Sequence, residues 1–155
     1  MREPRDEHEA KTIADVLTHG WHVLKVLEDD AGPGFAYTVG LRHSFGHPEL
    51  IVVGLAPDVG HALLNLAGES IRQGGRYAEG IDYDDLLRGH ACRFRDVPVS
   101  QFRPYLGWAL WFYEGPSFPA LQLIWPDPDG RWPWDPAVDP AIRDLQPVIA
   151  EQGAS

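Results

Sequence analysis

The chain has 155 residues, of which 44% are hydrophobic, enough to bury the core of one domain and too few for two ordinary domains. Its formal net charge of -10 repels phosphate backbones and anionic lipid headgroups, so we expect no nucleic-acid and no membrane partner. A single cysteine, Cys92, excludes an intramolecular disulfide and a cysteine-based metal cage. Charged first residues and the lack of any apolar run of about 20 residues favour a soluble, acidic, cytoplasmic protein.

The first third of the chain is predicted to form one helix followed by strands. Residues 6–19 have helical apolar spacing, and Gly20 is a typical helix stop. Strands are expected at 21–27, 35–41 and 50–55, where β-branched or alternating apolar residues gather. The last of these is apolar throughout, which is typical of a strand covered on both faces.

A second helix is predicted to begin at Pro57, to carry an apolar stripe that includes Val59, Leu63 and Leu66, and to end at Gly74. The remaining segments are, in chain order, a polar loop with one helical turn (77–89), a strand (90–97), an apolar helix or strand in which Pro104 favours helix (104–113), a strand (120–125) and an irregular tail.

This order of elements predicts a single α+β domain spanning residues 1–155. We expect a mixed or mainly antiparallel β-sheet with helices packed on it and a Pro/Trp-rich C-terminal tail. Residues 1–8 and 147–155 are expected to be flexible.

Three segments together resemble a known bacterial family. They are FAYTVGLRHSFGHPELIVVGL (35–55), FPALQLIWPD (118–127) and DGRWPWDP (129–136), and they are similar to the domain of unknown function DUF4262. The resemblance covers about residues 20–136. Because the activity of that family is unknown, the resemblance implies no catalytic residue and no cofactor.

The turn from His43 to Glu49 carries the residue types that bind ligands or transfer protons near neutral pH. The favoured interpretation is structural: Glu49 caps backbone N–H groups, and His47 hydrogen-bonds a carbonyl. A ligand-contacting or proton-handling role is the first alternative. The second is a metal site at His43 and His47, which we do not expect because Gly46 and Pro48 favour a loop over a helix. Such a site would also need a third ligand, for which the sequence offers His22 or His90.

Two further features extend this candidate site. Thr38 lies on the small-residue face of its strand, where a helix or a flat ligand can approach closely. Trp125 begins the aromatic tail, which is either a lid on the sheet or a wall of a pocket. The predicted ligand-binding residues are therefore Thr38, His43, His47, Glu49 and Trp125.

The function predicted first is binding of a small molecule between the His43–Glu49 turn and the aromatic tail, in a domain that is either a binding protein or an enzyme. One alternative is a protein-interaction module, immunity or regulatory, with a basic protein partner, which the acidic charge favours. Another is a flavin-binding, split-barrel-like protein, by analogy of element order alone. The sequence contains no P-loop, no dinucleotide fingerprint and no nucleophile elbow.

Overall fold

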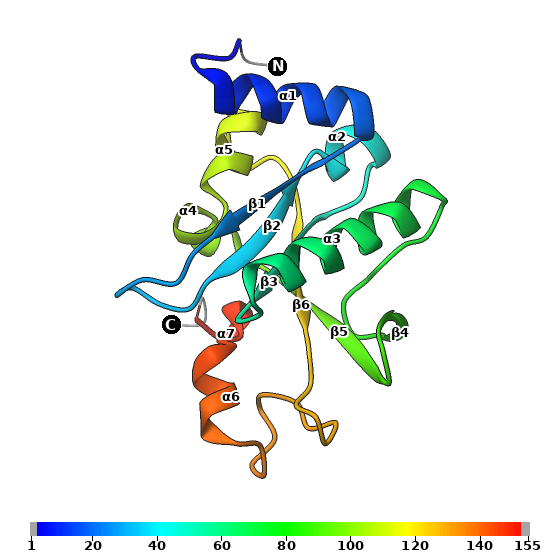
Figure 1. Ribbon diagram of the computed structural model, residues 1–155, viewed down its shortest axis with the longest axis vertical. Helices are drawn as coiled ribbons and strands as arrows, with labels where there is room; N and C mark the ends of the chain where they lie inside the picture. The colour runs from blue at the N-terminus through cyan, green and yellow to red at the C-terminus, as the bar shows by residue number, and fades with distance from the viewer. Residues whose placement is uncertain (1–2, 153–155) are drawn as a thin grey trace.

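The computed structural model describes residues 3–152, which form one α+β domain around a six-stranded sheet (Figure 1). The strand order is β1-β2-β3-β6-β5-β4, so β1 and β4 are the edges of an open sheet. Neighbouring strands are antiparallel except β3 and β6, which are parallel, so the predicted mixed sheet is confirmed. The strands are β1 (His22–Val26), β2 (Phe35–Val39), β3 (Glu49–Val53), β4 (Asp82–Leu87), β5 (His90–Asp96) and β6 (Ala120–Ile124).

Helices cover both faces of this sheet. The longest, α3 (Pro57–Arg72), packs on one face against β1, β2 and β3 (Figure 1). The other face is covered by α1 (Glu7–His19), α4 (Phe102–Tyr105) and α5 (Gly107–Tyr113). Alternate residues of β3 enter the two cores: Leu50 and Val52 the α3 side, and Ile51 and Val53 the other side. The apolar run predicted for this strand therefore reflects burial on both faces.

The first helix is built as its sequence predicts. The Asp6 side chain accepts a hydrogen bond from the Glu9 backbone N–H, and Gly20 ends α1 with φ of 106°, in the left-handed region. Gly40, at the end of β2, lies so close that an added Cβ would stand 2.7 Å from a Val16 methyl group. This contact fixes the end of α1 against the sheet, next to the start of β1.

Two buried glutamines hold the C-terminal segment on the sheet. The Gln146 amide accepts from the Trp125 backbone N–H and donates to its carbonyl, at 2.9 and 2.8 Å. The Gln122 amide in turn donates to the Pro147 carbonyl and accepts from the Ile149 N–H, both at 2.8 Å. Each glutamine thus bonds backbone groups that have no strand partner.

Several segments differ from the prediction. Residues 77–89, expected to be a loop with one helical turn, contain the edge strand β4. Its sequence is polar because most of the strand is exposed, and Leu86 is its buried residue. The expected loop at His43 is the short helix α2 (Leu41–Phe45), which Gly46 ends. The apolar segment 104–113 is helical as predicted, but it is divided at Leu106 between α4 and α5, and Pro104 lies within the first turn of α4, where no N–H is needed. The tail is only partly irregular, since it contains the short helices α6 (Pro140–Leu145) and α7 (Ile149–Gln152).

Some residues of the two ends belong to helices and to the core, while the expected flexibility of these ends stays a prediction. Glu7 and His8 open α1, and Ile149 is buried in the core beneath α4 and α5. Residues 1–2 and 153–155, which fall within the two predicted flexible ends, lie outside the described residues.

Candidate functional site

The Glu49 carboxylate lies at the centre of the turn that the sequence singled out. It is fully buried at the start of β3 and faces the N-terminal end of α2. It accepts five hydrogen bonds, from the hydroxyl groups of Thr38 and Tyr113 and from the backbone N–H groups of Gly40, Leu41 and Arg42. The Thr38 bond measures 2.7 Å, and the three backbone bonds measure 3.1–3.2 Å.

This arrangement makes Glu49 the cap of α2, supplied from a neighbouring strand. Burial raises the pKa of the Glu49 carboxyl, while the bonds from Tyr113 and Thr38 act in the opposite direction. The Thr38 hydroxyl also accepts from the Leu50 N–H at 2.9 Å, so its own bonding is complete. The contacts of Glu49 and Thr38 are therefore those of a structural connection between β2, β3 and α2.

His47 is likewise bonded on both sides of its ring. Its Nε2 accepts from the Tyr77 backbone N–H at 3.0 Å, so its proton is on Nδ1, which lies 2.8 Å from the Pro48 carbonyl oxygen. Burial lowers the pKa of His47, which favours this neutral form.

His43 is exposed on α2. Its ring lies edge-on to the Phe112 ring, with the two ring centroids 5.9 Å apart. Within residues 3–152, no group of three or more His, Cys, Asp or Glu side chains is placed to hold a metal ion.

Trp125 lies away from the turn. It follows β6, and its indole N–H donates to the Val53 carbonyl at the far end of β3 from Glu49. With about 3.3 Å per strand residue, four residues of β3 separate the two places by roughly 13 Å. Five surface pockets of the described residues, among them the groove described below, are lined by residues other than Thr38, His43, His47, Glu49 and Trp125. As ligand contacts, these five residues stay a prediction.

The rest of the aromatic tail packs on β5. Trp132 and Trp134 stack with ring centroids 5.5 Å apart, and the Arg93 guanidinium lies 4.7 and 5.6 Å from the two centroids. Arg93 Nε in turn donates to Asp82 Oδ1 of β4 at 2.6 Å. These contacts are those of a lid over the β4–β5 end of the sheet.

Cys92 lies on β5 and is fully buried. Burial and the nearby Asp85 carboxylate raise its pKa to about 12, so the thiol stays protonated at neutral pH. The contacts of Cys92 are those of a core residue.

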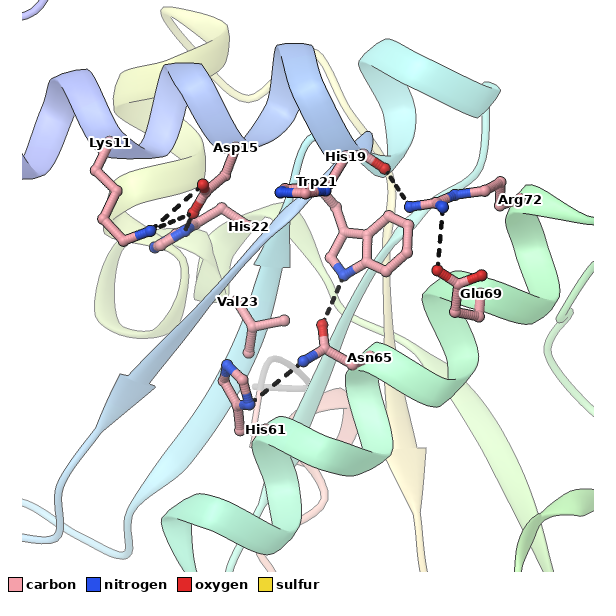
Figure 2. Close-up of a pocket in the computed structure, with 10 residues that line it drawn as sticks. All are labelled: Lys11, Asp15, His19, Trp21, His22, Val23, His61, Asn65, Glu69 and Arg72. Atoms are coloured by element: carbon pink, nitrogen blue, oxygen red, sulfur yellow. Dashed lines mark hydrogen bonds and ion pairs between the residues drawn. The ribbon is translucent and has the colours of Figure 1, made fainter.

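A different place gathers polar side chains at the surface. A groove of about 440 Å³ lies where β1, at the edge of the sheet, passes between α1 and α3 (Figure 2). Ten residues from these three elements and the connection between α1 and β1 line it: Lys11, Asp15, His19, Trp21, His22, Val23, His61, Asn65, Glu69 and Arg72.

The inner wall of this groove is Trp21. The Trp21 ring packs so close to the backbone of α3 that a Cβ atom added to Gly68 would lie 2.5 Å from the ring. The indole N–H donates to Asn65 Oδ1 at 2.9 Å, and the Asn65 amide nitrogen lies 3.3 Å from His61 Nδ1 (Figure 2). Arg72 lies over the ring at 4.9 Å from its centroid and donates to the His19 carbonyl at 2.6 Å.

The opposite wall is an Asp15–His22 pair. His22 Nδ1 lies 2.7 Å from Asp15 Oδ2, and Lys11 donates to the same oxygen at 3.0 Å. Burial raises the pKa of Asp15, but the bonds from His22 and Lys11 outweigh this, so the net shift is downward. Asp15 is therefore ionised at neutral pH and orients the His22 ring.

Reasoning from the sequence missed this groove, naming from it only His22, as a possible metal ligand. Its residues come from segments that are separate in the sequence and contain no motif. One signal was present: Lys11 with Asp15, and His61 with Asn65, are spaced i, i+4 on predicted helices. Such pairs are common on solvated helix faces, and the pattern alone does not indicate that the two faces meet.

The fold defines a small α+β domain, and the sequence comparisons agree with the resemblance seen in its motifs. Residues 15–139 match the model of the family described as "Domain of unknown function (DUF4262)". This match covers most of the chain and extends beyond the expected 20–136 at both ends, so the chain belongs to that family. Searches of curated proteins and of solved structures found no match. Between residues 3 and 152, no helix has both the length and the apolar character needed to cross a membrane.

Proposed function

We propose that this domain binds a small anionic molecule, one with a carboxylate or a phosphate group, in the α1–β1–α3 groove. The carrying observation is the local charge composition. The whole chain has 13 Lys and Arg side chains against 23 Asp and Glu, whereas in the groove Lys11 and Arg72 equal the two carboxylates in number and three of the seven histidines are added. The groove therefore repels an anion less than the acidic chain as a whole, and its imidazoles add hydrogen-bond donors.

The size and polarity of the groove support a small ligand. Its volume of about 440 Å³ falls in the range of ordinary small-molecule sites. Trp21 and Val23 provide an apolar wall, and imidazole, ammonium and guanidinium groups surround it. These groups are hydrogen-bond donors of the kind that recognise carboxylate and phosphate oxygens.

The lining favours binding over covalent catalysis. The ten residues include no serine, threonine or cysteine, so the Asp15–His22 pair has no hydroxyl or thiol nucleophile beside it in the groove. The flavin-binding alternative gains no support from the open sheet, in which β1 and β4 each have one neighbour.

A basic protein partner is a second proposal, which the net charge of -10 supports. Such a complex would not depend on Lys11.

An NMR titration of ¹⁵N-labelled protein tests the first proposal. The probes are inorganic phosphate and citrate, which separate the two anion chemistries, and sodium chloride at equal ionic strength is the reference. We expect saturable shifts of the backbone amides from Trp21 to Val23 and of the Asn65 side-chain amide for at least one probe. Shifts that do not saturate, or that appear only outside the groove, would count against it.

The two lysines of the chain provide a matched pair of variants. Lys11 lines the groove, whereas Lys25 lies on β1 outside it and pairs with the exposed Asp58. Lys11→Ala should weaken anion binding about fivefold, and Lys25→Ala should leave it unchanged. An equal effect of the two substitutions would indicate general charge attraction rather than a site.

A further inference from the structure

The Trp21–Asn65–His61 chain fixes where the His61 proton lies. An indole N–H only donates, so Asn65 must present its oxygen to Trp21 and its NH₂ group to His61. His61 Nδ1 is then a hydrogen-bond acceptor without a proton, and the proton of the neutral ring is on Nε2. In this contact the Asn65 NH₂ group donates, so Nδ1 serves as the acceptor of the ring.

His22 has the opposite environment. Its Nδ1 faces the Asp15 carboxylate, which only accepts, so Nδ1 carries a proton. No group among residues 3–152 is bonded to His22 Nε2, which is the position where a second proton adds. The resulting imidazolium lies beside an anion, and Asp15 and His22 are both largely buried, with exposed side-chain fractions of 22% and 18%.

The charges around His22 otherwise cancel. Lys11 pairs with Asp15 at 3.0 Å, and Arg72 pairs with Glu69 at 3.2 Å. The titratable and charged groups that share the groove with His22 are Lys11, Asp15 and His19 from α1 and His61, Glu69 and Arg72 from α3. With neutral imidazoles the lining has no net charge, so a proton on an imidazole gives an entering anion an additional positive charge to face.

We infer that the groove takes up a proton on His22 when it binds its anion, and that His61 acts there as a fixed Nε2–H donor. This inference rests on the proposed function and adds its regulation: affinity rises as the pH falls. An imidazole is the side chain that changes charge between pH 5 and 8, and Asp15 stays ionised in that range. By linkage, the anion and the proton must each strengthen the binding of the other.

The protonation states are measured first, without any ligand, from the imidazole ¹⁵N shifts of the native protein between pH 8 and 5.5. At pH 8 the proton of His22 should be on Nδ1, whereas the proton of His61 should be on Nε2 and its Nδ1 should be bare. Asn65→Asp is the matched variant, because a carboxylate accepts from Trp21 and from His61 alike; His61 should then move its proton to Nδ1. A native His61 with a protonated Nδ1 at pH 8 would overturn this assignment.

The coupling is measured with sulfate, an anion that does not itself titrate near neutral pH. Sulfate should bind about tenfold more tightly at pH 6 than at pH 8, within the usual range of coupling between two ligands. His22→Gln should abolish this pH dependence. His61→Ala should weaken binding equally at both pH values, and His90→Ala, on β5 outside the groove, should have no effect.

The outcomes separate the two proposals. Equal sulfate affinity at pH 6 and 8 would overturn the coupling while supporting an anion site. Binding of sulfate, phosphate and citrate at neither pH would overturn the anion site and, with it, the coupling. The imidazole spectra without ligand would still decide the proton positions on His22 and His61.

Discussion

The Trp21 indole N–H donates to Asn65 Oδ1 at 2.9 Å, although the two residues are 44 positions apart in the chain. This bond joins the residue that precedes β1 to the middle of α3, and Trp21 forms the inner wall of the groove. It requires the indole to lie against the backbone of α3, and Gly68 is the residue that permits this approach.

Gly68→Ala should therefore destabilise the protein. The new methyl group would lie 2.5 Å from the Trp21 ring, which is buried and cannot move away freely. Overpacking of this kind costs about 1–3 kcal/mol of unfolding free energy, measurable by urea denaturation. Gly107→Ala is the matched control in α5, because no atom lies within 4 Å of its Cβ position, and it should be neutral or slightly stabilising. Equal effects would contradict the packing described for Trp21.

Glu49→Ala should cost about 3–5 kcal/mol of unfolding free energy. It removes the acceptor of five hydrogen bonds and leaves their donors unpaired in the interior. Tyr113→Phe removes only one of these donors and should cost about 1–2 kcal/mol. Urea denaturation at pH 7 measures both. A stable Glu49→Ala protein that has lost ligand binding would instead support the functional interpretation of the turn.

Gln146→Ala should loosen the C-terminal segment. The backbone N–H and carbonyl of Trp125 would both lose their partners in a buried place, at a cost of about 2–4 kcal/mol. Hydrogen exchange of the Trp125 backbone amide should become faster as the stability of this segment falls. Gln152→Ala is the control on the same segment, since Gln152 is exposed and bonds the Tyr105 hydroxyl at the surface. Unchanged exchange at Trp125 would show that Gln146 does not hold the segment.

Asp15→Asn should lower stability in a pH-dependent way. The pKa of Asp15 is depressed in the folded protein, so its ionised form contributes stability above the unfolded-state pKa of about 4. That contribution is lost as the pH falls through the lower folded-state pKa. The variant should be less stable by about 1 kcal/mol at pH 7. The thermal unfolding temperatures of the variant and the native protein should converge as the pH approaches about 2.

Asp58→Asn is the reference for this series. Asp58 has a 96% exposed side chain and a single long contact with Lys25 at 3.4 Å, so its substitution should have little effect at any pH. A constant difference between Asp15→Asn and the native protein at every pH would contradict the role given to ionised Asp15.

Much of the fold could be predicted because its signals are local. The caps of α1, Pro57 at the start of α3 and the apolar run of β3 each depend on neighbouring residues. The errors have a common cause in tertiary context. Strand β4 is polar because it is an edge, and the buried face of α3 includes Gly60 and Gly68, which carry no hydrophobic signal.

The same cause made the predicted apolar stripe of α3 wrong in part, although Leu63 is buried as predicted. Val59 and Leu66 were predicted to share it with Leu63, yet they are 54% and 50% exposed. The glycines take the positions closest to the sheet, with the Gly60 Cβ position 3.5 Å from the Ala36 methyl group. Helical periodicity alone assigns such positions to the larger apolar residues.

The groove could not be predicted from the sequence for a similar reason. Its lining comes from α1, β1 and α3, and the contacts that bring these elements together depend on Gly68, Gly40 and Trp21. The structural interpretation of the His43–Glu49 turn was accessible, because a carboxylate close in sequence to backbone N–H groups is a common local cap.

The most direct test of the anion site is a crystal structure of the protein soaked at pH 6 with selenate, which anomalous scattering locates without ambiguity. We predict an ordered selenate in the α1–β1–α3 groove, within hydrogen-bonding distance of His22, His61 or Arg72. Selenate bound elsewhere on the surface, with the groove holding none, would contradict the proposed function.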